Sequence, residues 1–197
     1  EMVAVRIPRR RGGAVVVGRD EAVRPDTTRE GRATLPAVTR DKGGMITAGN
    51  APGLNDGGAA LVLMSGARLK ERNATPIARV VAYATGGGEP KDLFFAPIDA
   101  VQKLMKQMGV KIGHFDLIEA NEAFAAQALA DGDALGWDWD RVNVNGGAVA
   151  LGHPIGASGA RVLTTLLYAM EAQGKKTGLA TLCLGGGNAV ALAVERG

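Results

Sequence analysis

The sequence predicts an α/β fold: a layered α/β/α domain with a mixed, mainly parallel sheet and a C-terminal antiparallel hairpin. Two observations lead to this prediction. Apolar runs of strand length alternate with amphipathic stretches of helix length, which is typical of sheets covered by helices on both faces. The chain also ends on two strand-like runs, residues 178–183 and 188–195, that flank a reversal containing three glycines.

The first part of the chain differs in composition from the rest. Residues 1–46 are rich in Arg, Gly, Pro and Asp, and short apolar alternation at residues 2–7 and 14–17 predicts two strands there. We interpret this part as a tail and residues 47–197 as the layered domain. In that domain, the continuous apolar run at residues 59–64 predicts a buried strand.

The remaining elements follow from periodicity and end signals. Ser65 is a suitable N-cap for a short helix through Arg72, and a strand is expected at residues 77–84. Gly109 and Gly174 stand where helices should end. The expected helices cover residues 101–108, 123–135 and 158–173, and a short buried strand covers residues 115–118.

Composition excludes several classes of protein. The 197 residues are 46% hydrophobic and 22% charged, which is ordinary for a soluble globular chain. No apolar stretch approaches the roughly 20 residues that span a bilayer, so we expect no membrane association. The single cysteine allows neither an internal disulfide nor a thiolate metal site, which favours a cytoplasmic protein. The net charge of +3 is too mild to indicate nucleic-acid binding.

Two segments combine glycine and asparagine near expected strand ends. Residues 50–58, Asn-Ala-Pro-Gly-Leu-Asn-Asp-Gly-Gly, form either a plain loop or a loop that a ligand approaches closely. Residues 121–124, Asn-Glu-Ala-Phe, lie where a buried strand hands over to a helix, the place where ligand crevices open in α/β folds. Asn121 could equally be a simple helix cap.

Two further segments hold the residues most suited to chemistry. His153 lies among glycines in Gly152-His-Pro-Ile-Gly-Ala-Ser-Gly159, after Asn145-Gly-Gly-Ala148, and it precedes a helix whose N-terminus favours anions. Cys183 ends a strand beside three glycines, which leave room for a ligand and for backbone N–H donors. A histidine and a cysteine together are an acid/base or nucleophile pair in outline.

These four segments occur in the order and spacing seen in thiolases. The chain resembles the C-terminal half of a thiolase over residues 47–197, and more loosely before them. The resemblance implies a ping-pong acyl transfer in which His153 activates a nucleophilic cysteine and, with a water held by Asn121, forms an oxyanion hole. It implies that Cys183 is the general acid/base for the α-proton of the second acyl-CoA. The backbone N–H of Gly185 would help bind the thioester oxygen.

The resemblance also implies contacts with coenzyme A. They would come from Arg24, from Ala51, Pro52 and Gly53 along the pantetheine arm, and from Phe124. Two positions depart from the family pattern. Pro52 stands where many members have Ser, so a hydroxyl and a backbone donor are lost. Asn188-Ala189 replaces a frequent Met-Gly and should only repack the hairpin.

The implied function is that of an acyl-CoA C-acyltransferase, most plainly an acetyl-CoA acetyltransferase that interconverts two acetyl-CoA with acetoacetyl-CoA and CoA in fatty acid metabolism. Acyl-CoA and CoA would be substrates, and neither a further cofactor nor a metal would be needed. Further copies of the protein would associate as a dimer or tetramer through a missing N-terminal half. That half would also carry the nucleophile, so this chain alone should not turn over.

Three alternatives stay open. The first is a degradative 3-ketoacyl-CoA thiolase, and the second is a non-catalytic module that binds CoA or assembles with another subunit. The third, a decarboxylating condensing enzyme, is disfavoured because such enzymes pair the nucleophile with two histidines or with a histidine and an asparagine. The second histidine here, His114, has the surroundings of a surface residue.

Overall fold

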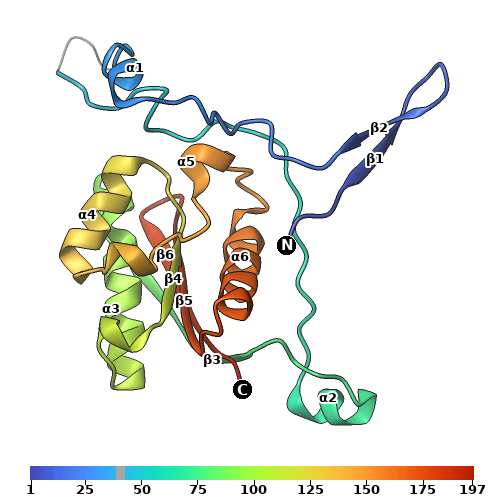
Figure 1. The fold of residues 1–197 in the computed structure, drawn as a ribbon. Helices are drawn as coiled ribbons and strands as arrows, with labels where there is room; N and C mark the ends of the chain where they lie inside the picture. The colour runs from blue at the N-terminus through green and yellow to red at the C-terminus, as the bar shows by residue number, and fades with distance from the viewer. Residues whose placement is uncertain (39–42) are drawn as a thin grey trace.

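The computed structural model describes residues 1–38 and 43–197, and its centre is a four-stranded sheet between layers of helices (Figure 1). The strands, in the spatial order β3-β6-β5-β4, are β3 (Arg79–Gly87), β4 (Leu117–Ala120), β5 (Thr177–Leu184) and β6 (Asn188–Glu195). The terminal hairpin of β5 and β6 is antiparallel, and β4 pairs parallel to β5. The predicted α/β class, mixed sheet and C-terminal hairpin are therefore confirmed.

The strand directions agree with a mixed, mainly parallel sheet. β4 and β5 pair in parallel, whereas β6 pairs antiparallel with both β5 and β3. The described strands β3, β4 and β5 therefore run in one direction, and β6, which the hairpin inserts between β5 and β3, runs in the other.

Helices cover both faces of this sheet, which confirms the α/β/α layering. One hydrophobic cluster lies between the sheet and α3 (Ala96–Met108), with Val101 and Leu104 at its centre. A second cluster lies on the other face against α6 (Ser158–Ala172), around Leu166 and Met170. The α3 layer also contains α4 (Ala125–Leu135) (Figure 1). Gly109 has a φ of 69° and caps α3 in the left-handed region, as its position predicts.

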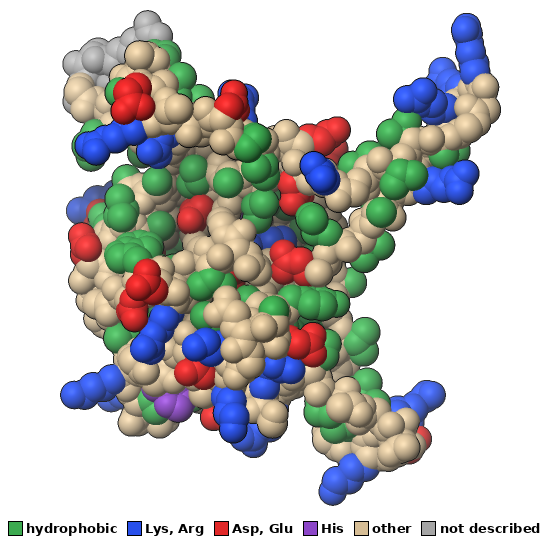
Figure 2. Space-filling view, in the orientation of Figure 1, with side chains coloured by type: hydrophobic (Ala, Val, Ile, Leu, Met, Phe, Trp, Pro, Cys, Tyr) green, Lys and Arg blue, Asp and Glu red, His purple; other side chains and the backbone are tan. Residues whose placement is uncertain are grey.

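The first 78 residues lie largely outside this packed body (Figure 1). The two strands predicted near the N-terminus are β1 (Val5–Pro8) and β2 (Ala14–Val17), which pair as an antiparallel hairpin. Figure 2 shows basic side chains at the projecting tip of this hairpin. The short helices are α1 (Arg29–Ala33), α2 (Gly66–Arg72) and α5 (Ala148–Leu151), with 3-10 turns η2 (Pro90–Phe95), η3 (Ile112–His114) and η4 (Trp139–Arg141). Ser65 caps α2 as expected, because its side chain accepts from the N–H of Arg68.

The prediction of a buried strand at residues 59–64 is wrong. This run forms no strand, and its largest side chains except Leu61 face solvent, with Val62 88% exposed and Leu63 73% exposed. A continuous apolar run is typical of a strand buried on both faces. No neighbouring strand lies beside it within the described ranges, so the segment runs from the N-terminal region to α2 without a ladder partner (Figure 1).

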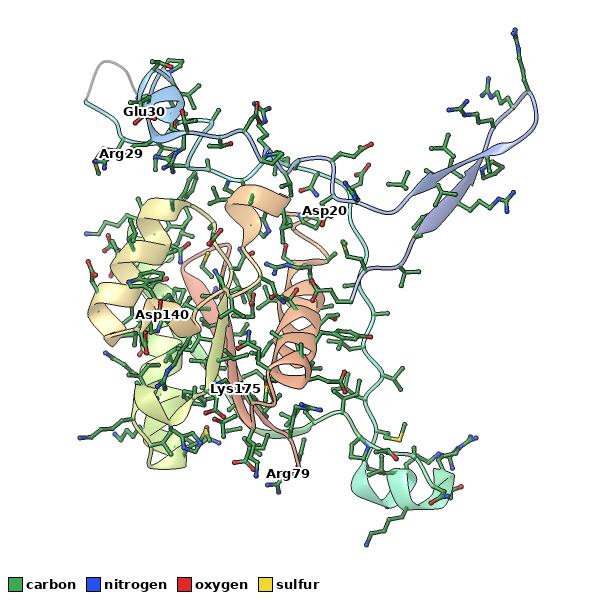
Figure 3. All side chains as sticks on the ribbon, viewed as in Figure 1. Asp20, Arg29, Glu30, Arg79, Asp140 and Lys175 are labelled. Carbon is green, nitrogen blue, oxygen red and sulfur yellow. The ribbon has the colours of Figure 1, made fainter. Side chains whose placement is uncertain are left out.

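The two ends of the sheet differ in what they carry. The carboxyl ends of the parallel strands β4 and β5 lie at one edge, toward α5 (Figure 1). Arg79 and Lys175 lie at the opposite edge, where β3 begins and β5 is about to begin (Figure 3). Outside residues 39–42, none of the helices combines the length and the apolar character needed to cross a membrane.

Candidate active site

Asn121 and Cys183 both lie at the carboxyl ends of the parallel strands β4 and β5. Ala120, the last residue of β4, is in register with Thr181 of β5, and the N–H of Asn121 donates to the Thr181 carbonyl at 3.0 Å. Cys183 lies two residues further along β5. Asn121 is 1% exposed, and neither the oxygen nor the nitrogen of its side-chain amide has a hydrogen-bond partner among the described residues. A buried unpaired amide is costly unless it serves a ligand or a water. Asn121 is not the cap of α4, which is Phe124.

The segment after β4 is fastened to the glycine loop that precedes α5. The Glu122 carboxylate accepts from the N–H of Val149 at 2.9 Å and from the side-chain amide of Asn143 at 3.2 Å. A Cβ on Gly147 would lie 2.4 Å from the Glu122 carboxylate, so a larger residue there would displace the carboxylate from these hydrogen bonds. The Glu122 carboxylate therefore holds the segment of residues 121–124 against the glycine loop of residues 145–148.

His153 lies in the turn between α5 and α6, against the loop of residues 50–58. Its N–H donates to the carbonyl of Gly53 at 2.9 Å. Gly152 before it has a φ of 96°, and a Cβ there would lie 2.2 Å from the Asn55 amide oxygen. The same loop reaches α4, since the N–H of Ala125 donates to the carbonyl of Asn50 at 2.9 Å. Hydrogen bonds thus connect the 50–58 loop both to the His153 turn and to the segment that carries Asn121.

The imidazole of His153 is half-buried and favours its neutral form. Burial lowers the pKa of His153, and the nearby Arg161 guanidinium lowers it further. A neutral imidazole can accept a proton at neutral pH, as a general base must.

The Cys183 thiol is free, half-buried and protonated in its resting form. Burial raises its pKa, and the buried Asp131 carboxyl raises it further. A thiol with a raised pKa is a stronger base once ionised, which suits the removal of a weakly acidic proton. The glycine turn after it is pinned by the bond from the N–H of Gly88 to the Gly187 carbonyl at 2.8 Å. A Cβ on Gly185 would meet nothing within 4 Å, so packing within the described chain does not require glycine there.

A cleft of about 370 Å³ opens beside the His153 turn. Its walls are residues 55–59 on one side and residues 154–157 with Ala160 on the other. Neither Asn121 nor Cys183 lines it. A shared cavity among His153, Cys183 and Asn121 therefore stays a prediction, although all three belong to segments at one edge of the sheet.

The predicted CoA contacts are placed unequally. Ala51 and Pro52 are half-buried, and Gly53 binds the His153 turn through its carbonyl. Phe124 packs edge-to-face on Phe94 with ring centroids 5.1 Å apart. Arg24 is exposed, and its side chain makes no hydrogen bond or ion pair to another predicted site residue within the described chain. His114 is exposed before β4, at the far edge of the sheet, as expected.

Sequence reasoning missed the buried charges around this edge. Glu119 on β4 is 1% exposed, and its carboxylate lies 3.6 Å from the Arg161 guanidinium on α6. Asp131 on α4 is fully buried and accepts a hydrogen bond from Gln127. The only signal for Glu119 was a charged residue inside an apolar strand next to Asn121.

These carboxyl groups make stability depend on pH. Burial raises the pKa of Glu119 to about 8, partly offset by Arg161, and burial raises the pKa of Asp131 to about 7. Both groups have unfolded-state pKa values near 4. Between these limits the folded chain holds protons that the unfolded chain has released, so stability falls as pH rises. Below about pH 4 both states are protonated, and the stabilisation is fully present.

We expect the free energy of unfolding to fall by on the order of 1.4 kcal/mol per pH unit for each held proton between about pH 4 and about pH 8. Urea titrations followed by circular dichroism measure this fall. Glu119→Gln should remove the part of this fall that one carboxyl group contributes. Glu30→Gln, on exposed α1, should leave the fall unchanged. An undiminished fall in Glu119→Gln would contradict the assignment of the held proton to Glu119.

Comparison with known proteins identifies the family. The model of the thiolase C-terminal domain matches residues 74–196, and the model of the thiolase N-terminal domain matches residues 1–67. This chain belongs to the thiolase family. An acetyl-CoA acetyltransferase of Thiocystis violacea is 53% identical over 197 residues, which is all of this chain and 50% of that thiolase.

Solved thiolase structures agree with the fold. The acetyl-CoA acetyltransferase of Bacillus anthracis gives a TM-score of 0.93 at 46% identity, covering 98% of this chain and 48% of that one. A human mitochondrial 3-ketoacyl-CoA thiolase in complex with CoA gives 0.85 at 36% identity, covering 93% of this chain and 46% of that one. The chain thus spans about half the length of the thiolases it matches.

Proposed function

We propose that the protein containing this chain is an acyl-CoA C-acyltransferase that interconverts two acetyl-CoA with acetoacetyl-CoA and CoA. The observation that supports this most is the joining of the His153 turn, the Asn121 segment and the 50–58 loop at the sheet edge where Cys183 lies. The relative from Thiocystis violacea, an acetyl-CoA acetyltransferase, supports the choice of substrate. The nucleophilic cysteine would lie in an N-terminal portion outside this chain, which would be inactive alone.

The proposed roles follow from the local chemistry. His153, neutral at its half-buried position, takes the proton of the nucleophilic thiol and later donates to an oxyanion. Asn121, with its buried unpaired amide, holds the water of that oxyanion hole. Cys183 moves the α-proton of the second acyl-CoA, and the N–H of Gly185 binds its thioester oxygen.

CoA would run along Ala51, Pro52 and Gly53 and past Phe124, with Arg24 toward a phosphate. Ala51 and Pro52 are half-buried, and the Gly53 carbonyl binds the His153 turn, which supports that path. The CoA complex of a related human thiolase also supports CoA as the ligand.

Assembly and location belong to the same proposal. Residues 47–197 would form one unit after a tail of residues 1–46, with the thiolase C-terminal domain model matching from residue 74 onward and the N-terminal domain model matching residues 1–67. The apolar residues 59–64 would pair with strands of the N-terminal portion, and through it the protein would form a homodimer or homotetramer. Because Cys183 must stay reduced to move a proton, a reducing cytoplasm suits it. The proposed acyl-CoA substrates suit a role in fatty acid metabolism.

A degradative 3-ketoacyl-CoA thiolase is the second candidate. The specific observation in its favour is the 0.85 TM-score to a human 3-ketoacyl-CoA thiolase. The identity of 36% to that protein is lower than the 53% to the acetyl-CoA acetyltransferase, so the shorter substrate is preferred.

A hybrid protein tests the proposal. In it, this chain follows the N-terminal portion of the Thiocystis violacea enzyme, and loss of the enolate absorbance of acetoacetyl-CoA on adding CoA reports cleavage. We expect turnover in the usual range of about 1–10³ per second, and slower cleavage of a longer 3-ketoacyl-CoA.

Two results would change the conclusion. Faster cleavage of the longer substrate would favour the degradative enzyme. A folded hybrid that binds CoA without turnover, beside an active parent enzyme, would favour a non-catalytic CoA-binding or assembly module.

A further inference from the structure

His153 has a buried neighbour whose hydrogen-bonding options are limited. Its Nδ1 lies 2.6 Å from the Oγ of Ser158, the first residue of α6. The same hydroxyl lies 3.1 Å from the carbonyl oxygen of Pro154. Ser158 is 1% exposed, so both contacts are shielded from bulk solvent.

Counting protons gives these contacts a direction. A serine hydroxyl has one proton to donate, and a carbonyl oxygen can only accept. For both contacts to be hydrogen bonds, the Ser158 hydroxyl must donate to Pro154 and accept from Nδ1 of His153. In the neutral ring, Nδ1 then carries the proton and Nε2 carries the lone pair.

We infer that Ser158 is a positioning residue that holds neutral His153 in the Nδ1–H tautomer and leaves Nε2 as its basic nitrogen. The catalytic meaning of this inference rests on the proposed function. The backbone supports the geometry from both sides. The N–H of His153 is bound to the Gly53 carbonyl. The Pro154 carbonyl accepts from the N–H groups of Ala157 at 2.8 Å and Ser158 at 2.9 Å, and the Ser158 hydroxyl is its third donor.

The tautomer fits the proposed first half-step without rearrangement. The S–H bond of the nucleophile breaks, and its proton moves to Nε2. The thiolate adds to the thioester carbonyl, the bond to the CoA sulfur breaks, and the leaving thiolate takes the proton back from Nε2. The bond from Nδ1–H to Ser158 persists throughout, so the ring keeps its orientation.

Nitrogen NMR of the full 197-residue chain tests the tautomer without any activity. Only two histidines are present, and a His114→Gln variant assigns their signals. We expect His153 to carry its proton on Nδ1, Ser158→Ala to give a mixture of tautomers, and Ser158→Thr to retain Nδ1–H. Thr165→Val, which removes another buried hydroxyl from α6, should leave the tautomer unchanged.

An Nε2–H tautomer in the unaltered chain would overturn the inference, as would an unchanged tautomer in a folded Ser158→Ala. If Ser158→Ala does not fold, the unaltered chain and Ser158→Thr decide. In the hybrid enzyme, Ser158→Ala should lower kcat by about 10–100-fold with little change in KM, and Ser158→Thr should restore most of it. The expected tautomer in an inactive hybrid would overturn the proposed function and leave the tautomer standing.

Discussion

Replacing Cys183 with alanine in the complete enzyme should lower kcat by about 10²–10⁴-fold with the fold intact. The reason is that the variant has no group to remove or return the α-proton of the second acyl-CoA. The first half-step does not use this thiol. A burst of CoA released from acetyl-CoA should therefore persist. The exchange of acetyl-CoA methyl protons with deuterated water should stop.

The matched control is Met105→Ala, which removes another partly buried sulfur side chain, from α3. It should lower stability and leave proton exchange unaffected. Near-normal turnover in Cys183→Ala would remove Cys183 from the acid/base role, and loss of the burst as well would assign it to acyl transfer instead.

His153→Ala should produce a loss of similar size, again about 10²–10⁴-fold in kcat, but at an earlier step. Without the imidazole the nucleophile stays a thiol, so the burst of CoA should disappear together with turnover. Rapid mixing with acetyl-CoA measures the burst, and cleavage of acetoacetyl-CoA by CoA measures turnover. This difference in the burst separates the two residues even where their steady-state rates agree.

The second histidine provides the control. His114 is exposed at the far edge of the sheet, and His114→Ala should leave both burst and turnover unchanged. A retained burst in His153→Ala would show that another group activates the nucleophile.

Local signals in the sequence predicted most elements of the packed body. The end of α3 at Gly109, the cap of α2 at Ser65 and the β5–β6 hairpin each depend on a few adjacent residues, and all three are confirmed. The strand at residues 59–64 failed because a strand requires neighbours, and neighbours are not a local property. The position of β6 between β3 and β5 is likewise set by tertiary packing, so adjacent residues do not indicate it.

The candidate site divides in the same way. Motifs found the segments of His153, Asn121 and Cys183, because glycine-rich turns next to apolar runs are visible in sequence. The bond from Val149 to Glu122 joins residues 27 positions apart, and the Glu119–Arg161 pair joins β4 to α6. Nothing in the spacing of those residues indicates that they meet.

The bare backbone at residues 59–64 has a practical consequence for anyone who produces this polypeptide by itself. Its backbone amide and carbonyl groups have no strand partner within the described chain, and exposed apolar side chains surround them. A second molecule can therefore pair with this segment through backbone hydrogen bonds. The isolated polypeptide should therefore aggregate as its concentration rises, under conditions of temperature and urea in which the layered body is still folded.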